Sequence, residues 1–300
     1  MGYALRPCPR IVRYTNRWKV RPSNMTKALL SVWFIFLMSS ALPAQTPSTS
    51  AAAAPDQKTD QKSKPATAAS AAPAAAASAE VDPQASAILD RYVAAIGGKD
   101  AWAKYSSRVS KGTIEIPAMS LTGTVEVSEK APNKMRSVVS IGETPFQQGF
   151  DGTVGWADDP QNGPRLLQGR ELEELKRDAE YARPINLRVL YSQIKFVGKE
   201  KLGDREVQVI EVSSPQTGSE KMYFDAQTAL LLRVVANRAG PDGNNTVESM
   251  LEDYADVDGM KLPMTVHQTA GSTSYVVHLT AVKHGVDIPD STFSAPESAH

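Results

Sequence analysis

The sequence predicts an α+β fold in which helices cover one face of a curved antiparallel sheet. An apolar stripe with helical spacing follows residue 82, a period of two begins at residue 113, and short strands separated by tight-turn sequences run from residue 194 onward. Consecutive strands joined by tight turns form an antiparallel meander. A sheet with one apolar face needs cover, and the helices are the available cover.

Residues 1–44 have the layout of a leader followed by a secretory signal peptide. The apolar block "ALLSVWFIFLM" (28–38) follows Lys27 and precedes the small residues "SSALPAQT". A membrane-spanning helix needs about 20 apolar residues, so we expect cleavage after Ala44 or Ala41 in preference to a retained anchor. Met25 lies just before the block and is an alternative true start. The only cysteine, Cys8, also precedes it, so we expect neither a lipoprotein anchor nor a disulfide in the exported part.

Residues 45–80 are dominated by Ala, Pro, Ser, Thr, Gln and Lys and contain no aromatic residue. Such a segment buries too little apolar surface to offset the entropy of ordering it. We therefore expect a disordered linker between the signal peptide and a single folded domain at 81–300.

The whole chain has 33 basic and 33 acidic residues, so its formal charge is zero, but the charge of the folded part is not. Residues 1–80 hold ten of the basic and three of the acidic ones, which leaves 23 basic and 30 acidic residues in 81–300, a formal charge of −7. An acidic domain is a poor electrostatic match for nucleic acid or an anionic membrane surface. We expect no nucleic-acid partner.

The folded domain should open with a helix. Asp82 is placed to cap it and Pro83 suits its first turn. One face carries an apolar stripe, and Gly97-Gly98 should end the helix. The stripe consists of Ile88, Leu89, Tyr92, Val93 and Ile96.

Strands should follow at 113–116, 121–127 and 134–141, and then a hairpin at "GFDGTVGW" (149–156). Asp151-Gly152 is a strong turn signal. We interpret this stretch as architecture and not as a reactive loop: the turn returns Trp156 to the sheet, facing either the core or a ligand.

A second helical zone covers residues 169–193, and Pro184 should break it into two helices. Its charged side chains are interpreted as solvent-facing: Lys176 and Arg177 as surface pairs with Glu171, Glu173, Glu174 and Asp178, and Arg165, Arg170 and Arg188 as exposed cations.

The remaining strands are expected near 194–200, 205–212, 219–225, 229–236, 246–254, 261–270 and 273–283. Along "ALLLRVV" (229–235) both faces are apolar, so that strand should be covered on both sides.

Few residues offer chemistry. The chain lacks the G-x-S-x-G, H-E-x-x-H and P-loop motifs, and His267, His278, His284 and His300 are interpreted as strand or terminal residues without a nucleophile to activate. The acidic run 251–260 does not fit the ligand spacing of a calcium loop and is interpreted as a hairpin at Asp258-Gly259. Asp158-Asp159 is interpreted as a solvated turn pair. We expect no catalytic residue, no metal and no cofactor.

Four motifs in order carry a resemblance: "FDGTVGW" (150–156), "MYFDAQTALLLRV" (222–234), "EDYADVDGMKLPMTV" (252–266) and "FSAP" (293–296). Together they resemble the outer-membrane lipoprotein-sorting protein family, which is similar to the periplasmic lipoprotein carrier LolA. The resemblance implies an unclosed antiparallel β-barrel of about eleven strands with helices as a lid. No arginine matches a motif well enough to be assigned the role of gripping that lid.

The resemblance also implies a non-enzymatic periplasmic protein that binds acyl chains or lipidated proteins, with only transient membrane contact if the signal segment is cleaved. The alternative is an envelope sensor or protein-interaction module with the same fold and no lipid cargo; an enzyme acting on a cell-wall or lipid substrate is the weakest hypothesis. The expected cavity wall consists of Met119, Leu121, Met135, Phe146, Phe150, Trp156, Leu172, Leu175, Tyr223, Leu231, Met264 and Tyr275.

Overall fold

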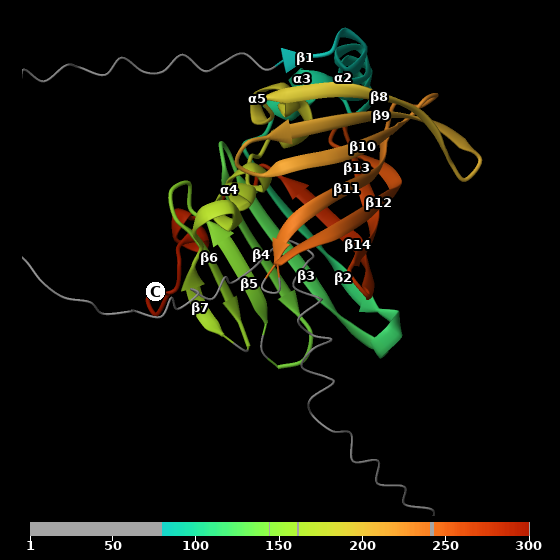
Figure 1. The fold of residues 1–300 in the computed structure, drawn as a ribbon. Helices are drawn as coiled ribbons and strands as arrows, with labels where there is room; N and C mark the ends of the chain where they lie inside the picture. Colours follow the sequence, from blue (N-terminus) through green and yellow to red (C-terminus); the bar gives the residue numbers. More distant parts are fainter. Residues whose placement is uncertain (1–79, 144, 161, 241–242, 300) are drawn as a thin grey trace, which may run out of the picture.

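A single sheet runs through the whole domain, and the first long strand pairs with the last (Figure 1). The computed structural model describes residues 80–143, 145–160, 162–240 and 243–299. In these residues fourteen strands follow the order β1-β8-β9-β10-β11-β12-β13-β14-β2-β3-β4-β5-β6-β7. The short strand β1 is parallel to β8, whereas the other neighbouring pairs are antiparallel.

The strands are β1 (Glu80–Val81), β2 (Ser107–Ile116), β3 (Leu121–Lys130), β4 (Lys134–Ser140), β5 (Phe146–Phe150), β6 (Gly155–Asp159), β7 (Gly163–Leu166), β8 (Gln193–Leu202), β9 (Arg205–Ser214), β10 (Gly218–Asp225), β11 (Leu231–Gly240), β12 (Gly243–Val257), β13 (Met260–Ala270) and β14 (Thr273–His284). The helices are α2 (Pro83–Ala95), α3 (Gly98–Ala103), α4 (Gly169–Asp178) and α5 (Leu187–Leu190), with 3₁₀ turns η2 (Pro117–Met119), η3 (Arg183–Ile185) and η4 (Asp290–Phe293).

The sheet is curved but not closed, because its two ends, β1 and β7, do not pair with each other. Figure 1 shows the series β2–β7 below and the series β8–β14 above, with α2, α3 and α5 at the β8 end and α4 between the two series. The predicted α+β class with an unclosed barrel and covering helices is confirmed. The resemblance implied about eleven strands, whereas the described residues form fourteen. The sequence pattern did not indicate β1 and the Pro-containing β7, because such short strands carry no periodic pattern.

The first helix begins as predicted. The Asp82 carboxylate accepts hydrogen bonds from the backbone N–H groups of Gln84 and Ala85, at 2.7 and 3.1 Å. Gly97 has φ 109°, a left-handed conformation that ends α2 and reverses the chain. The chain then enters a helix that the sequence did not predict, α3, which buries Trp102; the Trp102 indole donates to the Ile96 carbonyl at 3.2 Å.

The second helical zone is also broken as predicted, with η3 at Pro184 between α4 and α5. The hairpin at 258–259 is confirmed: Val257 pairs with Met260, and Asp258 and Gly259 both have positive φ, 56° and 88°. The turn between β5 and β6 spans 151–154, with the Asp151 carboxylate accepting from the N–H groups of Thr153 and Val154.

Buried side chains form three clusters. One joins β2–β6 and β14 to α4, and a second joins α2, α3 and α5 to β8–β11 and β13. The third lies on the opposite face of β9–β11, because side chains alternate along a strand. Leu231 belongs to the second cluster and Leu232 to the third, so β11 is buried on both faces, as predicted.

The expected signal segment and most of the expected linker lie outside the described residues. The first described residue, Glu80, belongs to β1 and pairs with Gln193 of β8. Among the helices of the described ranges, none is long and hydrophobic enough to span a bilayer.

Candidate ligand cavity

A cavity of about 430 Å³ lies between the concave face of the sheet and the segment that contains α4, η3 and α5. Its size is within the roughly 300–1,000 Å³ of typical small-molecule sites. The lining residues are Tyr92, Trp102, Arg108, Ser110, Val127, Glu129, Met135, Glu174, Asp178, Glu180, Tyr181, Arg183, Pro184, Leu187, Met222, Leu231, Val234, Arg238, Val247, Ser249, Leu251, Tyr254, Lys261, Leu262, Pro263, Val266, Gln268, Val277 and Leu279.

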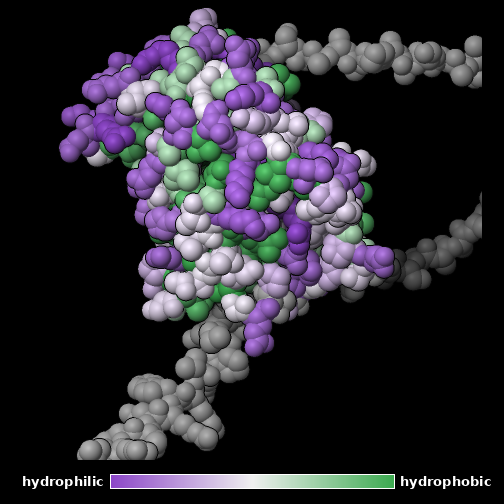
Figure 2. All heavy atoms as spheres, turned by 180° about the vertical axis from the view of Figure 1, so that it is seen from behind, coloured by the Kyte–Doolittle hydropathy of each residue, from purple (hydrophilic) through white to green (hydrophobic). Residues whose placement is uncertain are grey.

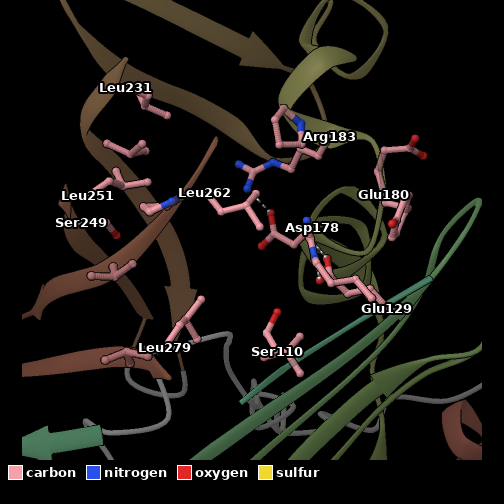
Figure 3. A pocket seen from close by; sticks show the side chains of 18 of the residues that line it. Ser110, Glu129, Asp178, Glu180, Arg183, Leu231, Ser249, Leu251, Leu262 and Leu279 are labelled. Carbon is pink, nitrogen blue, oxygen red and sulfur yellow. Dashed lines mark hydrogen bonds and ion pairs between the residues drawn. The ribbon is translucent and has the colours of Figure 1, made fainter. Parts of the chain in front are cut away.

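One wall of the cavity is apolar and comes from β10–β14. In Figure 3, Leu231, Leu251 and Leu262 approach the space from the left and Leu279 from below. Side chains alternate between the two faces of a strand, so every second residue of β12 lies on the cavity side. These residues are Val247, Ser249 and Leu251. Figure 2, seen from behind, shows hydrophobic side chains open to view across the middle of the molecule, between hydrophilic ones.

The opposite wall is charged. Figure 3 shows Arg183, Asp178, Glu180 and Glu129 along the right-hand side, from η3, α4, the segment after α4, and β3. Glu129 forms a bidentate ion pair with Arg108, whose Nε and Nη2 atoms donate to the two carboxylate oxygens at 2.7 Å each. The Arg108 guanidinium also lies 5.7 Å from the Trp102 ring centre and 5.5 Å from that of Tyr181. This pairing fixes a charged group at the edge of an apolar space.

A buried ion cluster ties the α4–η3 segment to β10 and β11. Arg177 and Glu220 are 2.6 Å apart, with side chains only 5% and 2% exposed. Arg238 on β11 lies 3.4 Å from Glu220 and 3.3 Å from Asp178. Arg183 reaches the same two carboxylates at 3.5 Å each. Because a buried charge is stable only when it is paired, these contacts hold the segment over the cavity.

Glu174 is a cavity-lining carboxyl whose pKa moves into the neutral range. Its side chain is 2% exposed; Arg170 Nε donates to one oxygen at 2.7 Å and Arg238 lies 3.8 Å from the other. Burial raises the pKa of Glu174 to about 7, although the hydrogen bond and charge of Arg170 act to lower it. This side chain therefore changes charge near neutral pH.

These contacts correct the interpretation of α4 as a solvent-facing charged helix. Glu171, Glu174 and Arg177 are buried, at 8%, 1% and 5% exposure. The three arginines expected to be exposed are also engaged: Arg165 with Glu171, Arg170 with Glu174, and Arg188 with Asp90. Only the Lys176–Glu173 pair is a surface pair as expected.

Two of the twelve side chains expected to line a cavity do so, Met135 and Leu231. Seven pack in the cluster of β2–β6, β14 and α4: Met119, Leu121, Phe146, Phe150, Leu172, Leu175 and Tyr275. Trp156 is buried and its indole donates to the Phe293 carbonyl at 2.8 Å. Tyr223 belongs to the cluster on the opposite face of β9–β11, and Met264 is half-buried outside the lining.

The sequence did not predict most of the lining, including Leu251, Leu262 and the charged wall. Alternation along β12 and β13 was the available signal for the leucines. Within the described ranges, no histidine or cysteine lines the cavity, and no three His, Cys, Asp or Glu side chains are grouped as a metal ion would require.

Comparison with known proteins gives solved structures only: no family model and no curated protein matches the chain. A DUF1329 family protein from Desulfovibrio piger is 13% identical, with 70% of this chain and 97% of that chain covered and a TM-score of 0.48. A LolA superfamily protein from Nitrosomonas europaea is 16% identical, with 70% and 97% covered and a TM-score of 0.47. A domain described as an outer membrane lipoprotein-sorting protein, from Vibrio parahaemolyticus, is 13% identical, with 69% and 94% covered and a TM-score of 0.46.

Two of these three bear the name of the group that the sequence motifs resemble.

Proposed function

We propose that this protein is a non-enzymatic periplasmic binding protein for acyl chains or lipidated proteins, of the kind used in outer-membrane lipoprotein sorting. The observation that carries the proposal is the cavity of about 430 Å³ with a wall of leucine and valine side chains. Burial of an acyl chain contributes about 0.8 kcal/mol per methylene, so such a wall favours a long hydrocarbon over a polar ligand.

The lining residues favour binding over catalysis. Two serine hydroxyls, those of Ser110 and Ser249, line the cavity. A serine nucleophile needs a base to activate it, and no histidine of the described residues lies among the lining residues. The arginine side chains of the wall are ion-paired with carboxylates, as Arg108 is with Glu129. These ion-paired side chains form the wall of a binding site.

The periplasmic location is inferred from the sequence. The apolar block at 28–38, with its basic flank and small-residue border, predicts export followed by cleavage after Ala44 or Ala41. Contact with the membrane is then transient, during transfer of the cargo.

Titration of the lipid-stripped mature chain with a fluorescent fatty acid tests the proposal. We expect saturable, one-to-one uptake at micromolar concentration, weakened by Leu251→Gln, which places an amide in the apolar wall. Val189→Gln is the matched control, because Val189 is 82% exposed and outside the cavity.

Absence of saturable uptake by the unmodified chain would contradict the proposal. Native mass spectrometry of the freshly purified protein separates the alternative: a copurifying lipid supports the carrier, whereas a copurifying envelope protein without lipid supports an interaction module.

A further inference from the structure

We propose that the cavity holds one acyl chain of a single-chain amphiphile whose polar head has no net charge, and not the several chains of a lipoprotein anchor. This inference rests on the proposed function and names its substrate class. Three features carry it: the volume of the cavity, the fixation of the segment that covers it, and the pairing of the charges that line it.

The volume corresponds to one chain. A dry protein cavity of about 150 Å³ accommodates benzene, with its six carbons, so about 25 Å³ is needed per carbon. By the same ratio the cavity of about 430 Å³ accommodates about 17 carbons. That is one long acyl chain, and each additional chain would need nearly the same volume again.

The covering segment is held on both sides, so the volume cannot readily grow. Towards β10 it is fixed by the buried Arg177–Glu220 pair at 2.6 Å. Towards β2 and the β3–β4 turn it is fixed by Tyr181, whose N–H donates to the Pro132 carbonyl at 3.0 Å and whose hydroxyl donates to the Ser107 carbonyl at 3.2 Å. Lifting the segment would leave buried charges unpaired, which is strongly unfavourable.

Cationic and carboxyl side chains are equally numerous along the cavity. Four cationic and four carboxylate side chains are present, and each arginine has a carboxylate partner. Among the charged lining residues, Lys261 and Glu180 make no ion pair within the described ranges, and they have opposite signs. An anionic head bound at one of these arginines would have to displace that arginine's carboxylate, and Lys261 is exposed, so solvent screens its attraction for an anion. An uncharged or zwitterionic head needs no such exchange, and the Ser110 and Ser249 hydroxyls face the space for it (Figure 3).

The test compares amphiphiles that differ in chain number and head charge, with the lipid-stripped mature chain and native mass spectrometry. The probes are palmitoyl lysophosphatidylethanolamine and monopalmitoyl glycerol, palmitate as the single-chain anion, dipalmitoyl phosphatidylethanolamine, and a tripalmitoylated cysteinyl peptide. We expect one-to-one complexes with the first two, weaker binding of palmitate, and the weakest binding of the two- and three-chain probes.

A chain-length series sharpens the result. From about eight carbons upward the affinity of a lysophosphatidylethanolamine should rise about fourfold per methylene and then level off near 17 carbons. Leu279→Trp adds six heavy atoms to the cavity wall, so the plateau should move about six carbons shorter. Leu166→Trp is the matched control, because Leu166 is 37% exposed on β7, away from the cavity, and its plateau should not move.

Each outcome is decisive. Binding of the tripalmitoylated peptide as tightly as the single-chain probes overturns the inference and leaves the proposed function standing. Tighter binding of palmitate than of monopalmitoyl glycerol overturns the assignment of an uncharged head. A plateau that stays in place in Leu279→Trp refutes this cavity as the site, and failure of every probe to bind refutes the proposed function itself.

Discussion

Removing Glu220 should destabilise the domain more than removing any exposed charge, because its buried carboxylate is an ion-pair partner of three guanidinium groups. Arg177 lies 2.6 Å from it and is only 5% exposed, and Arg238 and Arg183 follow at 3.4 and 3.5 Å. Loss of one partner of a buried ion pair costs about 3–5 kcal/mol, since it leaves an uncompensated charge. With a urea m-value of about 2 kcal/mol per M, Glu220→Ala should lower the unfolding midpoint by about 2 M.

The assay is urea unfolding of the mature chain, followed by tryptophan fluorescence. The double variant Arg177→Met with Glu220→Leu removes the closest pair and should recover at least half of the loss, because an apolar pair replaces these two ions and Arg183 and Arg238 keep Asp178 as a partner. Lys199→Ala is the control: Lys199 and Glu206 are 56% and 55% exposed, and breaking such a pair costs about 1 kcal/mol or less. A midpoint shift for Glu220→Ala as small as that of Lys199→Ala would refute the structural role assigned to this cluster.

Three further outcomes are expected. Asp82→Ala should lower the free energy of unfolding by about 1 kcal/mol through loss of the α2 cap, while Asp82→Asn keeps most of it; equal losses would contradict the cap. Gly97→Ala should cost more than Gly163→Ala in thermal melts, because both have positive φ but only at Gly97 would a Cβ collide with a backbone carbonyl, that of Gly259. Because the pKa of Glu174 is raised from 4.5 to about 7, its contribution to the free energy of unfolding is complete below pH 4.5 and is lost as the pH rises through 7. Glu174→Gln should therefore reduce the fall in the free energy of unfolding between pH 5 and about 8. An unchanged dependence of that free energy on pH would contradict the shift.

Local signals in the sequence predicted much of the fold. Asp82 caps α2, Pro184 interrupts the second helical zone, and Asp258-Gly259 closes the β12–β13 hairpin, each through contacts within a few residues. Such features depend on backbone preferences that a short stretch already encodes.

The candidate site was harder to predict because its contacts are remote. Glu174 and Arg177 have the spacing of surface helix pairs, and only partners on β10 and β11 make their burial tolerable. Similarly, the Trp156 indole N–H donates to the carbonyl of Phe293, 137 residues away, and no periodic pattern in the sequence predicts this contact. Periodicity indicates which face of a strand is apolar, but it does not indicate which part of that face other side chains leave uncovered.

The junction between the two halves of the sheet affects the order in which the protein can fold. Ile114 of β2 pairs with Val277 of β14, 163 residues later in the chain. On the export route proposed above, β2 would reach the far side of the membrane long before its partner and would meanwhile present an open row of amide and carbonyl groups. Such bare edges promote aggregation, and distant pairings slow folding. On that route, the domain should therefore depend on a chaperone that shields the nascent edge until the last strand arrives.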